Sequence, residues 1–537
     1  MKPSHLKALL HLYRRRYPDQ GGYSRDQARE LAHLSSSTGR QIGLIINRHG
    51  QPVMVILGQP DQILIPELGR LRQSGGRLRG LRLLHTHLNR EGLTEEDLMD
   101  LVFLRLDSIG VLNVSSEGSP LSFQWAQILP LNPGHKPYMI SQPLPWDRVD
   151  VDFTLQAEAL EGELLHSSQP VHAASHRESA LLVSVGAAPR ETQQNSLEEL
   201  RDLSLTAGLN PVDTLIQRVS RVNPKHIMGK GKLAELEVAA LQNGASTLVF
   251  DGELTPAQMR NLADITERKI LDRTQVILDI FAQHATSRAG KLQVELAQLD
   301  YTLPRLIGKN RAMSRLAGGI GGRGPGETKL ELDRRRIRER RTRIKKELAK
   351  VRRNRDATRT RRQHAGLPIV ALVGYTNAGK SSLLNTLTHS SVFTADKQFA
   401  TLDPVSRRLR FPEDQEVILT DTVGFIRSIP ENLVEAFKAT LEELESADIV
   451  IHVADASHPE VRTQVIAVES ILNDMELRHV PTILALNKWD LLSRESRETM
   501  SLFFPQGIPV TALDRETLHP LIRAVSSILP HRAPAVP

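Results

Sequence analysis

The 537-residue sequence contains no cysteine. This absence excludes disulfide bonds, thiolate metal sites and cysteine nucleophiles together. Aromatic residues make up only 4% of the chain, and no apolar run approaches the roughly 20 residues that a membrane-spanning helix needs. The N-terminal stretch Met1–Gln20 lacks the continuous apolar segment of a signal peptide. We therefore expect a cytoplasmic protein with no membrane span.

Charge is balanced along most of the chain and concentrated in one place. The formal net charge is +7, but Lys and Arg crowd into Lys329–Arg362, which is expected to form one long basic helix. A local basic stretch indicates an anionic partner, with nucleic acid first in line. The absence of interleaved aromatic residues argues against base stacking there. The alternative is a solvated helix face with internal salt bridges, whose acidic partners would be Glu331, Asp333, Glu339 and Glu347.

The hydrophobic fraction of 40% and the length predict several domains with buried cores, about three or four. Residues 1–190 are expected to form an extra N-terminal α/β domain with a linker. In it, Ile42–Ile46 and Val53–Leu57 predict a β-hairpin, and Thr94 predicts the cap of an amphipathic helix. The mixed stretch 156–195 is interpreted as the linker.

The remaining chain has an α/β pattern. We expect an α/β subdomain over 191–285, with helices and strands that alternate from Leu197. A helical hairpin with a glycine-rich loop should follow over 286–366, and Thr274–Leu303 is expected to be one long helical stretch. A nucleotide-binding domain should occupy 367–530. Residues 531–537 are expected to be a tail, with no further domain after it.

A phosphate-binding loop follows the apolar strand Ile369–Val373. The residues match G-x-x-x-x-G-K-[ST] and precede a helix, which is the context that this motif requires. Glycines let backbone N–H groups surround phosphates, and the helix N-terminus adds positive charge. Lys380 should contact the β- and γ-phosphates and Ser381 should bind Mg²⁺. The expected binding residues of this loop are Gly374, Tyr375, Thr376, Asn377, Ala378, Gly379, Lys380, Ser381 and Ser382.

Two further motifs predict a guanine nucleotide, GTP or GDP. The D-x-x-G motif ends a strand, and its aspartate should support Mg²⁺ through water; its residues are Asp421, Thr422, Val423 and Gly424. The N-K-x-D motif ends another strand, and the carboxylate of Asp490 can accept from both the N1–H and the 2-amino group of guanine. Adenine lacks both donors, so it would leave that carboxylate unpaired. The other expected base-site residues are Asn487, Lys488, Thr511, Ala512 and Leu513.

Hydrolysis of GTP is expected, with Lys380, Thr401 and Gly424 at the γ-phosphate. Thr401 is the predicted third Mg²⁺ contact, and the alternative is an ordinary turn threonine. Where Ras-like enzymes carry a water-orienting glutamine, this chain has Phe425. Because a phenyl ring cannot hydrogen-bond water, intrinsic hydrolysis should be slow until a partner completes the site.

The motifs resemble those of the HflX family of ribosome-associated GTPases, in the Obg/HflX branch. The resemblance rests on Phe399–Pro404, Asp421–Ile426, the glycine-rich Arg315–Thr328 and Gly229–Lys232, and it covers the chain from about Leu197. It implies an α/β subdomain, a helical hairpin and a GTPase domain with a mostly parallel sheet. It also implies a monomer that docks on the large ribosomal subunit and its rRNA and promotes dissociation or rescue of ribosomes. Use of ATP as well stays open.

The glycine-rich loop either lets the backbone approach RNA or serves as a hinge. For the whole chain the alternative function is a subunit-biogenesis GTPase that acts as an RNA-binding assembly timer.

Residues 1–190 lie outside this resemblance. Their His85-Thr86-His87 with Asp97 is similar to the zinc ligands of the JAB/MPN metalloprotease fold. Both histidines of H-x-H point to one face of a strand, which makes metal binding geometrically possible. The departures are a short spacing to Asp97, Thr94 for a serine, and Gln41 near the place of the catalytic glutamate. The alternatives are a degenerate JAB/MPN-like domain, plain structural histidines, or a metallopeptidase controlled by a GTPase domain.

Overall fold

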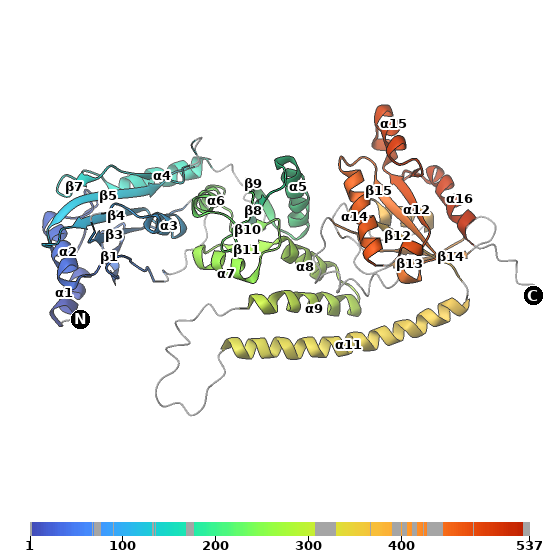
Figure 1. Cartoon of the computed structure of the whole chain (residues 1–537), viewed down its shortest axis with the longest axis horizontal. Helices are drawn as coiled ribbons and strands as arrows, with labels where there is room; N and C mark the ends of the chain where they lie inside the picture. The colour runs from blue at the N-terminus through green and yellow to red at the C-terminus, as the bar shows by residue number, and fades with distance from the viewer. Residues whose placement is uncertain are drawn as a thin grey trace, which may run out of the picture. The chain divides into compact units, whose positions relative to one another are not determined.

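The computed structural model describes residues 3–66, 68, 77–89, 91–130, 134, 136–167, 177–306, 329–365, 367–388, 399, 405–410, 416–422, 424–426, 444–475 and 477–529. The chain divides into two compact units. One comprises Met1–Arg201 with Gly208–Asp272, and the other comprises Asp202–Ala207 with Arg273–Pro537. Each unit is built from helices on largely parallel or mixed sheets (Figure 1), which confirms the predicted α/β class. None of the helices within the described ranges is long and apolar enough to cross a membrane.

The first unit begins with a seven-stranded mixed sheet in the order β2-β1-β3-β4-β5-β6, with β7 paired to β5. Only the β3–β4 pair among these is parallel. The strands are β1 (Ile42–Asn47), β2 (Pro52–Leu57), β3 (Leu81–His87), β4 (Ser108–Val114), β5 (Pro120–Ile128), β6 (Tyr138–Ile140) and β7 (Leu144–Pro145). The antiparallel β1–β2 pair confirms the predicted hairpin.

Helices cover both faces of this sheet because its central strands alternate between two cores. Ile42 and Leu44 of β1 pack with Leu12 and Leu31, whereas Ile45 packs on the other face. The first face is covered by α1 (Pro3–Leu12) and α2 (Arg25–Thr38), and the second by α3 (Glu95–Phe103) and α4 (Phe153–Ser167). The predicted cap of α3 is confirmed, since Thr94 forms a capping box with Asp97.

A four-stranded parallel sheet completes the first unit, in the order β11-β10-β8-β9. It contains β8 (Ser179–Gly186), β9 (Asn210–Arg218), β10 (Thr247–Phe250) and β11 (Lys269–Asp272), with helices α5 (Arg190–Thr206), α6 (Lys230–Gln242) and α7 (Pro256–Ile265). The stretch 156–195 is therefore not a plain linker. It contains most of α4, the start of α5 and a central strand, β8, whose apolar run pairs with both neighbours.

The two sheets of the first unit share cores. Leu98 and Leu101 of α3 belong to one cluster with Ala234 and Val238 of α6. Phe103 at the end of α3 packs in a second cluster with Leu233 and other residues of the four-stranded sheet layer. Since burial of apolar area is the main favourable term in folding, these mixed clusters join the two sheets into one body.

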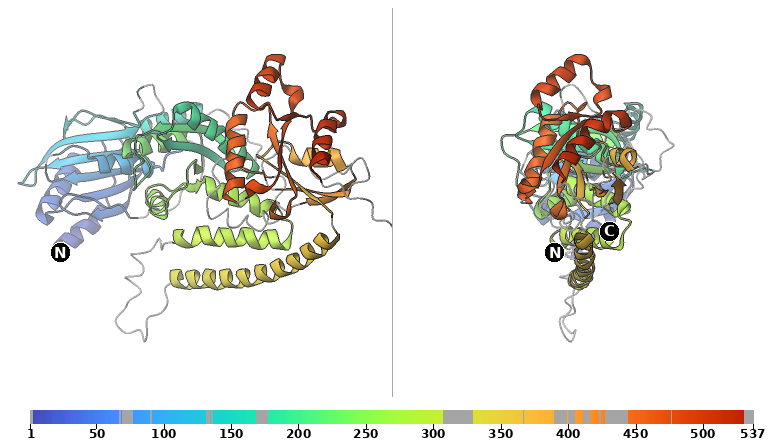
Figure 2. Two further views of the ribbon diagram at one scale, coloured as in Figure 1. Left: turned by 45° about the vertical axis from the view of Figure 1, so that its right-hand side comes forward. Right: turned by 90° about the vertical axis from the view of Figure 1, so that its right-hand side faces the viewer.

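The second unit contains a long helical hairpin. The expected long helical stretch over Thr274–Leu303 is helical over nearly all its length, but it is divided into α8 (Arg273–His284) and α9 (Arg288–Arg305). The first helix ends at His284, and Ser287 caps the second by accepting from the N–H of Gly290. The partner of α9 is α11 (Lys329–Ala365), which runs beside it in Figures 1 and 2.

The last domain has a six-stranded sheet in the order β13-β14-β12-β15-β16-β17, parallel except for β13. Its strands are β12 (Ile369–Gly374), β13 (Val405–Arg410), β14 (Glu416–Asp421), β15 (Ile449–Asp455), β16 (Thr482–Asn487) and β17 (Ile508–Pro509). Its helices are α12 (Lys380–Thr388), α14 (Val461–Asp474), α15 (Arg494–Phe503) and α16 (His519–Ile528), with short 3-10 turns at Leu444–Ser446, Leu477–His479, Trp489–Leu491 and Arg515–Leu518. Val370, Leu372 and Leu419 are fully buried in its core, as expected for strands covered on both faces.

Candidate functional site

The predicted nucleotide motifs come together at one edge of the six-stranded sheet. The phosphate loop follows β12, the D-x-x-G motif ends β14 and the N-K-x-D motif ends β16. These strands are parallel, and β14 and β12 are neighbours. Ligands of open α/β sheets bind at the carboxyl ends of parallel strands. The three motifs therefore lie where such a sheet binds a ligand.

The backbone of the phosphate loop leaves no room for a side chain at its two motif glycines. Gly374 has a φ of 152°, and a Cβ there would lie 2.1 Å from the carbonyl oxygen of Val453. Gly379 has a φ of 91°, and a Cβ there would lie 2.2 Å from Nδ2 of Asn487. Asn377 between them has a φ of 61°, which asparagine tolerates better than most residues. Gly374 is thus required by the close approach of the backbone of β15, and Gly379 by the side chain of Asn487.

Lys380 lies at the first turn of α12 and is buried. Its Nζ donates to the carbonyl oxygens of Gly374 at 3.1 Å and Tyr375 at 2.8 Å. Burial lowers the pKa of Lys380 to about 8, and the carboxylate of Asp421 acts in the opposite direction. The ammonium group is thus held inside its own loop by neutral carbonyl groups, and a phosphate would supply the negative charge that it lacks there.

Ser381 and Asp421 bring two oxygen ligands together. The hydroxyl of Ser381 donates to Oδ2 of Asp421 at 2.6 Å, and Asp421 is fully buried. Thr422 is fixed beside them, since its hydroxyl donates to the carbonyl oxygen of Leu372 at 2.6 Å. Oxygen atoms of this kind are the ligands that Mg²⁺ takes in proteins, so this pair fits the predicted metal contact.

Phe425 is tied to the phosphate loop through its backbone. Its N–H donates to the carbonyl oxygen of Gly374 at 3.0 Å, and its own carbonyl accepts from the N–H of Thr376 at 2.8 Å. The ring is buried, with 2% of the residue exposed. A Cβ at the preceding Gly424 would lie 2.8 Å from Cγ2 of Thr376. This glycine is therefore packed directly against the phosphate loop.

Asn487 holds two loops of the expected base site. Its Nδ2 donates to the carbonyl oxygen of Ala378 in the phosphate loop at 2.8 Å, and its Oδ1 accepts from the N–H of Ala512 at 2.8 Å. Ala512 is further held by Thr386 of α12, whose hydroxyl donates to its carbonyl oxygen at 2.5 Å. One buried side chain thus joins three of the predicted segments.

Asp490 is exposed, and its carboxylate accepts from the hydroxyl of Thr511 at 3.2 Å. Thr511 is fixed in turn by Thr517, whose hydroxyl accepts from the Thr511 N–H at 3.0 Å. Leu513 is 84% exposed. The hydroxyl of Thr511 is therefore in contact with the carboxylate expected to bind the base.

Sequence reasoning missed two residues of this site. Asp455 ends β15, and its Oδ2 lies 2.7 Å from Nζ of Lys488, which has a φ of 59°. Thr517 is the other, as the partner of Thr511. Asp455 had a signal, because a carboxylate follows a buried strand at the sheet edge where ligands bind. Thr517 had none.

Some predicted residues fall outside the described ranges. Val423 and the glycine-rich Arg315–Thr328 lie outside them. So does the expected switch segment with Thr401, of which the structure describes Phe399 alone. The remaining phosphate-loop residues Tyr375, Thr376, Ala378 and Ser382 all lie within the described loop and first helical turn.

The histidine pair of the first unit is also brought together with its aspartate. His85 and His87 on β3 and Asp97 on α3 are buried, and one ligand atom from each lies within 4.8 Å of the others. Gln41, which ends the loop before β1, is buried and lines the same cavity as His87 and Asp97.

Comparison with known proteins agrees with the motifs. Three protein-family models match in succession: a GTP-binding GTPase N-terminal region over residues 194–282, a GTPase middle region over 284–362, and a "50S ribosome-binding GTPase" over 369–488. Among solved structures, a GTP-binding protein from Sulfolobus solfataricus in complex with GDP is 25% identical, with a TM-score of 0.35; the match covers 65% of this chain and 98% of that one.

Curated relatives match at higher identity. GTPase HflX from Caldanaerobacter subterraneus subsp. tengcongensis is 49% identical over 319 residues, which are 59% of this chain and 74% of the relative. GTPase HflX from Escherichia coli K12 is 44% identical over 303 residues, 56% of this chain and 71% of the relative. The identity and the coverage of both relatives, together with the three consecutive family matches, establish the relationship. The chain belongs to the HflX family of GTPases, P-loop proteins that bind guanine nucleotides and hydrolyse GTP.

Proposed function

We propose that this GTPase docks on the large ribosomal subunit, contacts its rRNA, and promotes dissociation or rescue of ribosomes in a nucleotide-dependent way. The observation that carries the proposal is the exposed basic surface of α11 in a chain whose GTPase domain matches a family described as 50S ribosome-binding. Arg338, Arg343, Lys345 and Lys346 are exposed on that helix. Such side chains pair with phosphates, and binding through them weakens as salt rises.

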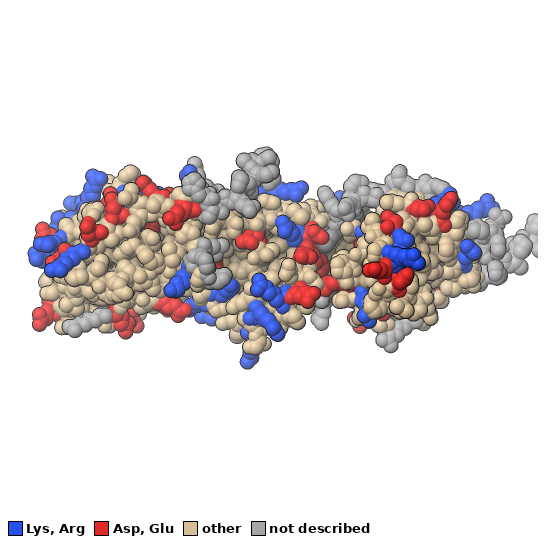
Figure 3. All heavy atoms as spheres, turned by 90° about the horizontal axis from the view of Figure 1, so that it is seen from above, with Lys and Arg blue, Asp and Glu red and all other residues tan. Residues whose placement is uncertain are grey.

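Not all the charge of α11 is available to a partner. Arg340 pairs with Glu295 of α9 through two contacts at 2.6 and 2.7 Å, Arg341 pairs with Asp300, and Glu347 pairs with Arg288 at 3.1 Å. Two of the expected internal pairs are present within α11, Arg335 with Glu339 at 3.1 Å and Arg336 with Asp333 at 3.7 Å, whereas the contacts with α9 were not expected and join the hairpin. The residues that remain exposed form a narrower basic surface. On the face drawn in Figure 3, by comparison, Lys and Arg among the described residues are interspersed with Asp and Glu.

The nucleotide roles follow the geometry of the site. We assign the phosphates to the loop Gly374–Ser382 with Lys380, and the guanine to Asp490 with Asn487, Lys488 and the loop Thr511–Leu513. Mg²⁺ would be held by Ser381, by Asp421 through water, and by Thr401. When bound there, Mg²⁺ would supply positive charge close to the transferred phosphate.

We further propose that hydrolysis is slow in the free protein. The Phe425 ring is buried and has no group that can orient water, so a ribosomal contact would have to supply one. The protein would act as a cytoplasmic monomer that hydrolyses GTP slowly until it docks. Addition of purified large subunits should then raise the turnover of GTP about a hundredfold or more, because one positioned group that acts on the attacking water typically contributes about 10²- to 10⁴-fold.

Cosedimentation with ribosomes tests the docking proposal. The chain loaded with a non-hydrolysable GTP analogue should pellet with large subunits and raise the fraction of free subunits, and the GDP-loaded chain should do neither. Equal pelleting in both states would overturn nucleotide-dependent docking. Binding only to immature subunits, with no rise in free subunits, would favour the assembly-timer alternative.

A charge-reversal pair sharpens the test. Arg343→Glu with Lys346→Glu should reduce pelleting and flatten its salt dependence. The matched control reverses Arg494 and Arg497, which are exposed on α15, and should leave pelleting unchanged. Equal losses in both double variants would indicate nonspecific attraction to RNA.

A further inference from the structure

The buried residues His85, His87 and Asp97 of the first unit have the spacing of metal ligands. The Nε2 atoms of His85 and His87 are 3.1 Å apart, and His85 Nε2 lies 3.2 Å from Oδ1 of Asp97. His87 Nε2 lies 3.6 Å from the other carboxylate oxygen, Oδ2 of Asp97. Ligand atoms at about 2.0–2.1 Å from a tetrahedral zinc ion lie about 3.3 Å from one another. The three distances fall around that value.

Neighbouring groups fix His87 and Asp97 in orientations that suit a cation, whereas Nδ1 of His85 has no hydrogen-bond partner among the residues that the structure describes. Nδ1 of His87 lies 3.2 Å from the carbonyl oxygen of Glu91, which requires a proton on Nδ1 and leaves the lone pair on Nε2. Oδ2 of Asp97 accepts from the N–H and the hydroxyl of Thr94, both at 2.8 Å. Hydrogen bonds of this kind to the far side of metal ligands orient them and set the histidine tautomer.

Burial makes the cluster unusual for ordinary polar residues. His85, His87 and Asp97 are only 0%, 3% and 6% exposed. Two imidazole nitrogens that face each other at 3.1 Å, beside a carboxylate, need a proton or a metal ion between them. Two imidazoles and one carboxylate form a ligand set that suits zinc better than the all-oxygen sites of Mg²⁺ or Ca²⁺.

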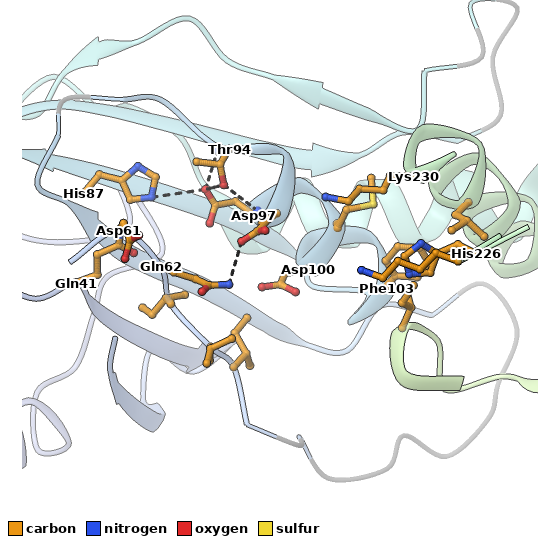
Figure 4. A pocket seen from close by; sticks show the side chains of 18 residues that line it. Gln41, Asp61, Gln62, His87, Thr94, Asp97, Asp100, Phe103, His226 and Lys230 are labelled. Carbon is orange, nitrogen blue, oxygen red and sulfur yellow. Dashed lines mark hydrogen bonds and ion pairs between the residues drawn. The ribbon is translucent and has the colours of Figure 1, made fainter. Parts of the chain in front are cut away.

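The cluster borders a cavity of about 390 Å³. His87, Thr94 and Asp97 line one side of it (Figure 4), and Lys225, His226 and Lys230 come from the four-stranded sheet layer of the same unit. A structural zinc ion is enclosed by four protein ligands, whereas a zinc ion with three keeps a position for water or another ligand. Within the described residues the cluster has three ligands and a cavity beside it.

We propose that His85, His87 and Asp97 form a mononuclear zinc site with its fourth coordination position open to this cavity. The site is separate from the nucleotide site, and it would give the first unit a ligand-binding role of its own. The rival interpretation is a hydrogen-bonded cluster that stabilises β3 against α3 and binds no metal.

Metal analysis of the full chain tests the proposal. Untagged protein is saturated with zinc, dialysed, and measured by inductively coupled plasma mass spectrometry, and about one zinc ion per chain is expected. His85→Ala and Asp97→Asn should lose that ion. The matched control His33→Ala, an exposed histidine on α2, should keep it. Zinc far below stoichiometric in the parent chain, or equal zinc in His85→Ala and His33→Ala, would overturn the site.

Two further measurements keep the test valid if a variant folds poorly. Binding of a fluorescent GDP analogue, which depends on the other compact unit, reports whether each variant retains a working GTPase domain. In the parent chain, zinc should raise the unfolding temperature of the transition that does not respond to GDP, because a ligand that binds only the folded state stabilises it. A shift of the same size in Asp97→Asn would contradict the proposal. Cobalt in place of zinc should give the visible absorption of a four-coordinate site.

Discussion

The carboxamide of Asn487 donates to the carbonyl oxygen of Ala378 at 2.8 Å, which joins the N-K-x-D motif to the phosphate loop. The same side chain accepts from the N–H of Ala512. Asn487 is 2% exposed, so water cannot replace either bond. In this position the asparagine holds the phosphate loop and the loop of Ala512 together. Its effect on nucleotide affinity would come from the positions of these two loops.

Asn487→Ala should weaken GDP binding about tenfold to hundredfold, because two buried hydrogen bonds of about 0.5–1.5 kcal/mol each are lost. Titration with a fluorescent GDP analogue measures the effect. Thr499→Ala, which removes an exposed hydroxyl from α15, is the control and should bind normally. An unchanged affinity in Asn487→Ala would show that the loops hold their positions without it.

The contact between Thr511 and Asp490, which the sequence did not predict, can also be tested. Its hydroxyl donates to the carboxylate of Asp490 at 3.2 Å. Thr511→Val keeps the shape and removes that donor, so affinity for GTP should fall about threefold to tenfold. Thr511→Ser restores the hydroxyl and should restore binding. If valine and serine behave alike, the contact with Asp490 does not contribute to recognition of the base.

The motifs could be predicted from sequence because each is a short run in a fixed local context. A strand, a glycine loop and a helix follow one another in 369–388, and no long-range information is needed to expect a phosphate site there. Contacts between distant residues could not be predicted. Lys488 meets Asp455, and Thr511 meets Asp490, only because parallel strands bring loops together at one edge.

Errors in the predicted elements have local physical causes. Residues Thr274–Leu303 contain no proline and a single glycine, Gly290, and a lone glycine is tolerated inside a helix, so the break before Ser287 was missed. There the side chain of Ser287 competes successfully as a cap. Strand β8 was missed because its apolar run, Ala180–Val183, follows a stretch rich in histidine and serine that was interpreted as linker.

In the hairpin, the arginines that form salt bridges with α9 should contribute to stability, and the exposed arginines should contribute to ribosome binding. Arg340→Ala removes the two contacts with Glu295, so it should lower the stability of the α9–α11 pair and leave ribosome binding largely intact at low temperature. Arg338→Ala changes an exposed residue without such a contact across the hairpin. It should weaken ribosome binding and leave the stability of the α9–α11 pair unchanged. Thermal unfolding and cosedimentation, measured on both variants, check the pair. If the two variants lose stability and ribosome binding to the same extent, Arg340 and Arg338 do not have the separate roles proposed for them.

His452 on β15 gives a prediction about acid stability. Burial, with a smaller contribution from Lys380, lowers the pKa of His452 to about 4, against about 6.5 for an exposed histidine. The folded state therefore binds fewer protons than the unfolded state between pH 6.5 and 4. Over that window the free energy of unfolding should fall as pH falls, by up to about 3 kcal/mol, and the loss should be complete below pH 4.

His452→Gln removes the titrating group and should flatten this part of the pH profile, even if the variant is less stable overall at pH 7. The measurement is urea unfolding at several pH values, followed through the transition that GDP shifts, since that transition reports the GTPase domain. His519→Gln, at an exposed position on α16, is the control and should keep the slope of the parent chain. A slope in His452→Gln equal to that of the parent would mean that other groups set the acid sensitivity of this domain. In that case, burial of His452 beside Lys380 would make no measurable contribution to how the domain responds to acid.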